Sequence, residues 1–243
     1  IATKASLYVL ARLLFTLFAG VPSITELAIT YVIVPLSLVG IFVGTVMAIY
    51  EKDIKLLLAH SSVAQIGYIA LGFGLASSAS VAASFVHIGN HALIKGGLFM
   101  AVGGFVAALS SRANLASFVG IGRRMPITAT AFTVCGLSLA GLPLTAGFIS
   151  KLYLVRAILA EDAYVIAALV LLSSALSLIY LWKIIEVMWM QPAPAKAPNL
   201  AENPAIYFPL WIVALANIWF GVDASWLVAA SRAAAAALLG GGL

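Results

Sequence analysis

The sequence predicts an all-α integral membrane protein. Of its 243 residues, 64% are hydrophobic and only 9% are charged, and the mean hydropathy is +1.14. Soluble domains carry about 25% charged residues. Apolar runs of roughly 20 residues recur along the chain, and runs of this length cross the hydrocarbon core as helices or closed barrels. The alternation expected of barrel strands is absent from the sequence, so we expect helices.

We expect about seven transmembrane segments connected by short loops. They cover residues 1–19, 30–50, 56–76, 81–108, 127–160, 163–190 and 205–222. The first residue is an Ile within an apolar run, so the first helix is expected to be truncated. Residues 191–204 are rich in Pro and polar residues. They predict an extended connector between a transmembrane core at 1–190 and a final helix with its tail at 205–243.

The charged residues predict how these segments are oriented. The net charge of +5 is concentrated in loops. Loops on one side carry Lys52, Lys55, Arg112, Arg123, Arg124 and Lys196, and those on the other side carry Glu26, Glu161, Asp162 and Asp223. By the positive-inside rule the first group faces the cytoplasm. The positive charge is therefore interpreted as a topology signal in a lipid-embedded protein, with no nucleic-acid partner expected.

The fourth segment carries the clearest functional pattern. His87, His91 and Lys95 are spaced i, i+4, i+8, which places them on one stripe of a helix. Lys95 is about 14 residues from either end of the segment, too deep for its side chain to reach an interface readily. Ionisable residues inside membrane helices tend to mark ion or proton paths, and histidine titrates close to neutral pH. The stripe predicts a proton relay. Histidines satisfied within the core are the plainer alternative.

The fifth segment is expected to be a broken helix. Its sequence AGLPLTAG, at residues 140–147, contains Gly141, Pro143 and Gly147, which interrupt the helical hydrogen-bond ladder. Breaks at membrane depth are tolerated beside protein or a cavity, and transporters use them at ion sites. Lys151 follows the break by one turn, so we predict a second proton site there.

Other polar residues in apolar segments are candidates for an accessory path. These are His60, Ser61, Gln65 and Tyr68 in the third segment, and Asn90 in the fourth. Ser and Gln also form hydrogen bonds between membrane helices, and His60 equally suits a surface position. Lys4, in the first segment, is from its charge alone either a pathway residue or an exposed cation.

The remaining residues indicate no catalytic chemistry. Cys135 is the single cysteine, so no internal disulfide or thiolate metal site can form and a packing role is expected. The two histidines have no HExxH pattern or carboxylate beside them, and a cationic Lys95 would repel a metal ion. No cofactor motif is found, so we expect neither a cofactor nor a metal. Lys183 and Glu186, at i and i+3, predict a local ion pair.

Five stretches together resemble the proton-translocating antiporter-like family of membrane subunits. They are TKASLYVLAR, EKDIKLLLAHSSVAQIGYIALG, HIGNHALIKGGLFMAVGG, RRMPITATAF and GLSLAGLPLTAGFISKLYLV, within residues 1–190. The family includes subunits A and D of Mrp (multiple resistance and pH) cation/proton antiporters, three membrane-arm subunits of respiratory complex I and related hydrogenase subunits. The phrases NHALIKGGLFM, GFISKLYL and SLIYLWKIIEVMWM are most similar to the D group of Mrp subunits.

The resemblance implies a fold and a pathway. The family fold has 14 helices in two inverted five-helix repeats, each with one broken helix. This chain resembles the C-terminal half: the last helix of the first repeat, the second repeat and the final helix. The resemblance places Lys4 on a central hydrophilic axis, His87, His91 and Lys95 on its histidine-containing path, and Lys151 after the second broken helix. The glutamate–lysine pair of the first repeat has no counterpart here, and His60 replaces a tyrosine common in the family.

The function implied is that of a proton-conducting subunit in a multisubunit cation/proton antiporter of Mrp type in the bacterial plasma membrane. An antiporter-like proton-pumping subunit of a respiratory NADH:quinone oxidoreductase or a membrane-bound hydrogenase is the alternative. A non-conducting structural subunit is a further alternative, although a ladder of buried cations argues against it. The expected partners are other membrane subunits, the missing N-terminal half of the subunit, and protons, with sodium also a candidate.

Overall fold

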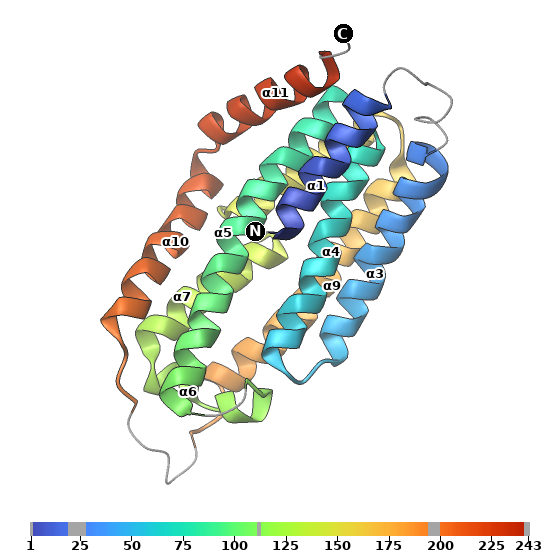
Figure 1. Cartoon of the computed structure of the whole chain (residues 1–243). Helices are drawn as coiled ribbons and strands as arrows, with labels where there is room; N and C mark the ends of the chain where they lie inside the picture. The colour runs from blue at the N-terminus through green and yellow to red at the C-terminus, as the bar shows by residue number, and fades with distance from the viewer. Residues whose placement is uncertain (1, 19–27, 111–112, 194–199, 241–243) are drawn as a thin grey trace.

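The chain folds into a bundle of helices that run along a common direction (Figure 1). The structure is a computed structural model that describes residues 2–18, 28–110, 113–193 and 200–240. Within these ranges there is no β-strand, and extended pairing is limited to an isolated bridge between Asp53 and Asn114. The prediction of an all-helical protein is confirmed.

Five helices in the described ranges are long and apolar enough to cross a membrane. They cover Tyr31–Tyr50, Ile54–Gly74, Ser78–Leu109, Tyr164–Trp189 and Pro204–Val222. The first includes the end of the π-helix η2 (Ala28–Ile33) and the whole of α3 (Val34–Tyr50); the others are α4, α5, α9 and α10. Each agrees with a predicted segment to within a few residues. The first predicted segment, 1–19, is helical over residues 2–17, as α1 (Ala2–Arg12) continued by the π-helix η1 (Leu13–Leu17); residues 1 and 19 lie outside the described ranges.

Local sequence signals set where several helices begin and how closely two of them pack. The carboxylate of Asp53 accepts hydrogen bonds from the first backbone N–H groups of α4, and Ser77 caps α5 in the same way, as expected of N-cap residues. α3 and α4 approach closely through Gly44 and Gly67. A Cβ on Gly67 would come within 2.7 Å of Ile41 and 2.8 Å of the Ser37 carbonyl oxygen. These close contacts hold α4 against α3, and α4 carries several of the buried polar side chains described below.

The predicted interruption of the fifth segment is present. α7 (Pro126–Ala140) and α8 (Ala146–Ala160) are separate helices joined by residues 141–145. Gly141, at φ +90°, and Leu144, at φ +65°, adopt left-handed backbone conformations, which suit glycine and are rare for leucine. Gly147 lies directly against the Ser138 backbone, where a Cβ would overlap the carbonyl oxygen. The two half-helices therefore remain in contact across the break.

The loops that carry most of the basic residues meet at one end of the bundle. Backbone hydrogen bonds join Lys52 to Leu115 and Ile54 to Ala113, which brings the α3–α4 turn to the 3-10 helix η3 (Leu115–Phe118). The short helix α6 (Ile121–Arg124) follows, and the loop before it bonds to the last turn of α9. This arrangement agrees with the predicted grouping of basic loops on one side. Arg112, Lys196 and Glu26 lie outside the described residues.

The C-terminal region differs from the sequence interpretation. The stretch treated as a tail forms α11 (Ser225–Gly240), consistent with the high helix propensity of its alanines. α10 and α11 follow one another along the same edge of the bundle (Figure 1). Asp223, which we assigned to an end loop, lies at their junction. Just before it, Gly221 packs against Leu144 and Thr145 of the α7–α8 break. Of the predicted connector at 191–204, residues 191–193 and 200–203 are not helical, and 194–199 lie outside the described residues.

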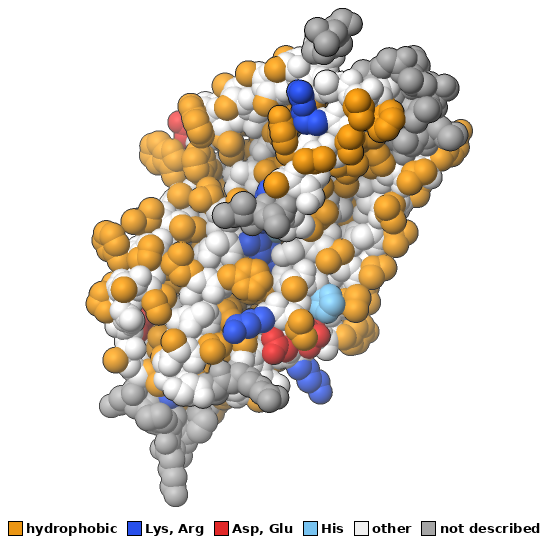
Figure 2. All heavy atoms as spheres, viewed as in Figure 1, with side chains coloured by type: hydrophobic (Ala, Val, Ile, Leu, Met, Phe, Trp, Pro, Cys, Tyr) orange, Lys and Arg blue, Asp and Glu red, His pale blue; other side chains and the backbone are white. Residues whose placement is uncertain are grey.

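Large apolar side chains cover much of the outer surface. Figure 2 shows them spread over the visible face, with few charged groups among them. Tyr31, Val165 and Leu36, for example, are more than 60% exposed. Extended apolar exposure of this kind fits contact with lipid or with other membrane subunits. The polar side chains instead gather inside, between α4, α5, α8 and α9.

Candidate functional site

Lys95 is buried in the middle of α5 and held by the neighbouring helix α4. Its side chain is 4% exposed. Nζ donates to the carbonyl oxygen of Leu58 at 2.6 Å and to the Ser61 hydroxyl at 2.5 Å. The Ser61 hydroxyl also donates to the Leu58 carbonyl at 3.0 Å. The amino group is thus bound by neutral oxygen atoms inside the bundle and does not reach an interface, which fits the depth expected from the sequence.

His87 connects α5 to two other helices. Its Nδ1 lies 2.8 Å from the Ser150 hydroxyl on α8, and its Nε2 lies 3.0 Å from the Gln65 side-chain oxygen on α4. An amide oxygen can only accept a hydrogen bond, so with this amide orientation Nε2 donates to Gln65. The Ser150 hydroxyl also lies 3.1 Å from the Gly147 carbonyl oxygen, so it can accept from a protonated Nδ1 or donate to an unprotonated one.

His91 is buried without a hydrogen bond to either ring nitrogen from any described residue. Its ring lies nearly parallel to that of His87, with an angle of 10° between the planes and 6.3 Å between the centroids. His91 is therefore a free acid–base group between Lys95 and His87.

Asn90, the next residue toward the N-terminus, donates to the Ala146 carbonyl at 2.6 Å. This hydrogen bond connects α5 to the start of α8.

Lys151 occupies the space opened by the helix break. Its Nζ donates to the carbonyl oxygens of Leu139 at 3.0 Å and Ala140 at 2.9 Å, and to the Ser174 hydroxyl at 3.0 Å. These carbonyls belong to the last turn of α7, where a continuous helix would use them internally. The C-terminal end of a helix also carries partial negative charge. The break thus supplies the binding site for the lysine that follows it.

Tyr68 links the histidines to Lys151. Its ring meets His87 edge-on at a centroid distance of 5.8 Å, and the Lys151 Nζ lies 5.4 Å from the ring centroid. Its hydroxyl donates to Ser173 on α9 at 3.0 Å. The structure therefore brings Lys95, His91, His87, Tyr68 and Lys151 into one polar series across the bundle.

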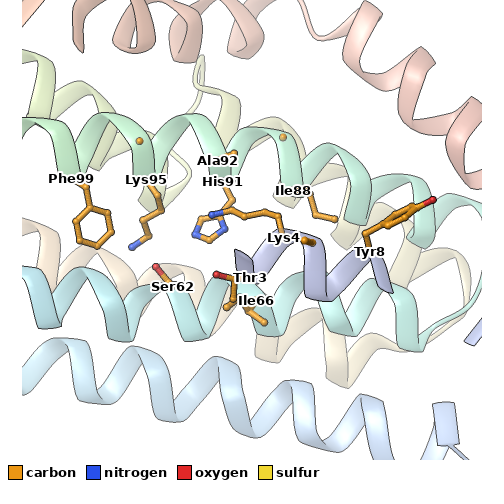
Figure 3. A pocket seen from close by; sticks show the side chains of 13 residues that line it. Thr3, Lys4, Tyr8, Ser62, Ile66, Ile88, His91, Ala92, Lys95 and Phe99 are labelled. Atoms are coloured by element: carbon orange, nitrogen blue, oxygen red, sulfur yellow. The ribbon is translucent and has the colours of Figure 1, made fainter. Parts of the chain in front are cut away.

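A groove of about 790 Å³ opens beside the first part of this series. It is formed by α1, α4 and α5, and its walls include Lys4, Tyr8, Ser62, His91 and Lys95. Figure 3 shows the Lys4 side chain extending along the groove toward His91. Among the described residues, no Asp or Glu lines the groove. Lys4, which its charge alone left open and which the resemblance placed on the central axis, lines the same groove as His91 and Lys95.

His60 does not join the series through any contact between described residues. Its Nε2 lies 3.8 Å from a Glu51 carboxylate oxygen, and both side chains are 25% exposed. Hydrogen bonds from the backbone N–H groups of Asp53 and Lys52 hold the pKa of Glu51 below its usual value. Lys183 does not form the ion pair predicted with Glu186; its Nζ donates to the carbonyls of Ile49 and Glu51 at the end of α3.

The sequence interpretation missed the hydroxyl groups that complete the site. Ser150 holds His87, Ser173 holds Tyr68 and Ser174 holds Lys151. The hydroxyl of Tyr180 is also buried in α9, without a hydrogen-bond partner among the described residues. Ser173, Ser177 and Tyr180 repeat at intervals of four and three residues along α9. That periodicity could have identified the inner face of α9.

The described residues form no cluster of three or more His, Cys, Asp or Glu side chains that could hold a metal ion. Cys135 is buried and unpaired, as expected for packing. What the site offers is a set of amines, imidazoles and hydroxyls without a carboxylate close to them. Such groups can pass protons to one another.

Comparisons with known proteins place this geometry in context. The sequence model described as "NADH:quinone oxidoreductase/Mrp antiporter, TM" matches residues 1–177. The chain is 38% identical over 206 residues to NADH-quinone oxidoreductase subunit N of Desulforudis audaxviator, which covers 84% of the chain and 40% of that protein. It is 27% identical over 227 residues to the D subunit of a Na(+)/H(+) antiporter of Bacillus subtilis, which covers 93% of the chain and 45% of that protein. The chain thus spans less than half the length of these relatives.

Two solved structures share the fold. The membrane-bound sulfane sulfur reductase, an archaeal respiratory membrane complex, matches 97% of this chain and 47% of its own with a TM-score of 0.84 and 30% identity. The Mrp complex from Dietzia sp. DQ12-45-1b matches 97% of this chain and 51% of its own with a TM-score of 0.85. Because the sequence identity in the second comparison is 24%, that comparison supports the fold alone.

Proposed function

Because this chain belongs to the NADH:quinone oxidoreductase/Mrp antiporter family of transmembrane subunits, we propose that it conducts protons within a multisubunit cation/proton antiporter of Mrp type. The complex would lie in a bacterial plasma membrane. The observation that carries the proposal is the buried series of Lys95, His91, His87 and Lys151, which ends at the helix break. Ionisable residues are expensive at this depth and are retained where ions or protons move.

The proposed route begins at the groove. Protons from the basic, cytoplasmic end reach Lys4 and Lys95 through the groove, where Ser62 and Thr3 can order water. His91 has both ring nitrogens free, so it can accept a proton from one side and release one toward His87. A proton that reaches His87 makes Nδ1 a donor to the Ser150 hydroxyl 2.8 Å away, while that hydroxyl donates to the Gly147 carbonyl oxygen. Tyr68 and Ser150 then lead to Lys151 at the break.

Both lysine sites suit a proton that must arrive and leave. Their partners are backbone carbonyls and serine hydroxyls, which stabilise an ammonium group through hydrogen bonds. A carboxylate partner would hold the charge far more strongly in a low dielectric. Neutral acceptors therefore hold the ammonium less firmly, and its deprotonation leaves no buried counter-charge behind.

A second candidate function places the same conducting chain in a redox-driven complex, either a respiratory NADH:quinone oxidoreductase or a membrane-bound hydrogenase. The 38% identity to an NADH-quinone oxidoreductase subunit N favours it, since the relative from a Na(+)/H(+) antiporter is 27% identical. The two candidates share the route and differ in the partner subunits. Whether sodium moves also depends on those partners.

The test begins with the whole complex. It is purified from native membranes through a tag on this chain, and its subunits are identified by mass spectrometry. A set of small membrane subunits alone supports the antiporter, and flavin or iron–sulfur subunits support the redox-driven complex. The complex is then reconstituted into vesicles with a pH-sensitive dye, with and without sodium. Proton movement that persists unchanged when the buried lysines are replaced would instead support the non-conducting structural subunit.

A further inference from the structure

The junction between α10 and α11 lies halfway through the bundle. α7 and α8 have 15 residues each, so at 1.5 Å per residue the break between them is about 22 Å from either end. Gly221 of α10 packs against Leu144 and Thr145 of this break, and Asp223 follows two residues later. The hydrocarbon core of a membrane is about 30 Å thick, so a group at this level lies far from both surfaces.

Contacts with α5 give the same depth. Val213 of α10 lies against Gly97, and Leu227 of α11 lies against Gly89. Asp223 falls between these two contact points in the sequence, and therefore at the level of the His91–Lys95 part of α5. The contacts with α5 and with the α7–α8 break thus agree in placing Asp223 near the centre of the bundle.

The Asp223 side chain faces outward at this depth. It is exposed, and its Oδ1 accepts a hydrogen bond from the Ser225 N–H at 2.9 Å, which caps α11. Among the described residues no basic side chain forms an ion pair with it. Three large apolar side chains within four residues of it in the sequence, Trp219, Val222 and Trp226, are 64%, 67% and 71% exposed. An apolar groove of about 510 Å³ continues along α10 beside Trp219 and Val222.

Lipid alone is a poor cover for this face. A carboxylate at the bilayer centre costs several kcal/mol, and membrane proteins compensate such groups with a partner charge or with water. Lys and Arg can reach an interface through their long side chains, whereas the single methylene of Asp223 cannot. Large exposed aromatic side chains around a polar centre are typical of protein interfaces.

We propose that the face formed by Trp219, Val222, Asp223 and Trp226 binds a transmembrane helix of another subunit that presents a Lys or Arg at the same depth. The basic side chain pairs with the Asp223 carboxylate, and the two Trp rings pack on the partner helix on either side of it. This inference rests on the multisubunit assembly in the proposed function. It does not depend on the proton route, which lies on the other side of α5 and α8.

The first experiment identifies what covers the face. Val222→p-benzoylphenylalanine is introduced into the tagged chain, and native membranes are irradiated before purification. We expect a cross-link to one partner subunit, with the linked peptide in a membrane helix that contains Lys or Arg. Cross-links to lipid alone, or to a helix without a basic residue, overturn the proposal.

The second experiment tests the charge. Asp223→Lys should lower the recovery of the cross-linked subunit with the tagged chain by about tenfold or more, because two facing cations cannot be buried together. Replacing the partner's basic residue with Asp should restore it. Glu161→Lys makes the same charge change at an exposed turn and should leave recovery unchanged. Full recovery in Asp223→Lys overturns the proposal. Proton movement by the wild-type complex, measured separately, shows whether the proposed function itself fails.

Discussion

Replacing Lys95 with Met is the sharpest test of the proton route. Met keeps most of the length and the apolar stem of the side chain, and removes the Nζ that is bound to Leu58 and Ser61 at 2.6 and 2.5 Å. Without the Lys95 amino group, a proton must cross the centre of the membrane with no group there to bind it. Insertion scales put the cost of a charge at the membrane centre at about 2.5–3.5 kcal/mol. At 1.36 kcal/mol per decade, we expect proton movement to slow by roughly 70- to 400-fold.

The assay is proton uptake by the reconstituted complex, driven by its own cation gradient or reductant and followed with a pH-sensitive dye. Lys55→Met is the matched control, because Lys55 is exposed at the start of α4 and should retain the wild-type rate. Lys95→Arg should fail as well, since arginine keeps its proton at every accessible pH. A Lys95→Met complex with a full set of subunits and a wild-type rate would refute the assigned role.

Three further changes test separate features. Lys151→Met should slow proton uptake as much as Lys95→Met without loss of subunits; a normal rate would remove Lys151 from the route. Gly147→Ala should destabilise the purified complex by about 1–3 kcal/mol in thermal unfolding, because its Cβ overlaps the Ser138 carbonyl, whereas Gly103→Ala, with open space around it, should not. Glu51→Gln should lower the stability of the complex at neutral pH and leave it unchanged in acid. Because the folded pKa of Glu51 lies below its ordinary 4.5, its stabilising contribution is present above that pH and is lost as the pH falls through the folded value. In thermal unfolding followed at a series of pH values, the difference in stability between Glu51→Gln and the wild type should therefore vanish in acid. A difference that persists in acid would contradict the role given to the Glu51 carboxylate.

The helices and the polar stripe could be predicted because each follows from a local rule. Apolar runs of membrane length identify α3, α4, α5 and α9, and the Gly–Pro–Gly sequence identifies the break between α7 and α8. The spacing of His87, His91 and Lys95 fixes their common face once the helix is assumed. None of these inferences needs to know which helices are neighbours.

Hydrogen-bond partners could not be predicted, because they come from packing between distant segments. The bond between Lys95 and the Leu58 carbonyl joins residues 37 apart, and that between Lys183 and Ile49 joins residues 134 apart. Sequence spacing favoured an ion pair between Lys183 and Glu186, but a helix C-terminus with free carbonyls also attracts a lysine. The tertiary contact prevailed because α9 packs beside the end of α3.

The position of Asp223 could not be predicted for a related reason. A carboxylate after an apolar helix of 19 residues is typical of a loop at the membrane surface. Tertiary contacts, those of Gly221 with the α7–α8 break and of Val213 and Leu227 with α5, show that α10 ends in the middle of the bundle. Depth in a membrane is set by which elements pack together, and hydropathy along the chain does not record it.

The charges along the described route suggest how a distant event could drive proton movement. The groove holds Lys4 and Lys95, and Lys151 lies beyond the histidines, with no Asp or Glu among the described groove residues. In a low dielectric, positive charges repel over several ångströms, so a proton on one carrier raises the energy of a proton on the next. The carriers therefore compete for charge. A partner subunit that changes the charge beside the groove would shift this competition and move a proton toward Lys151 without any large rearrangement of the helices.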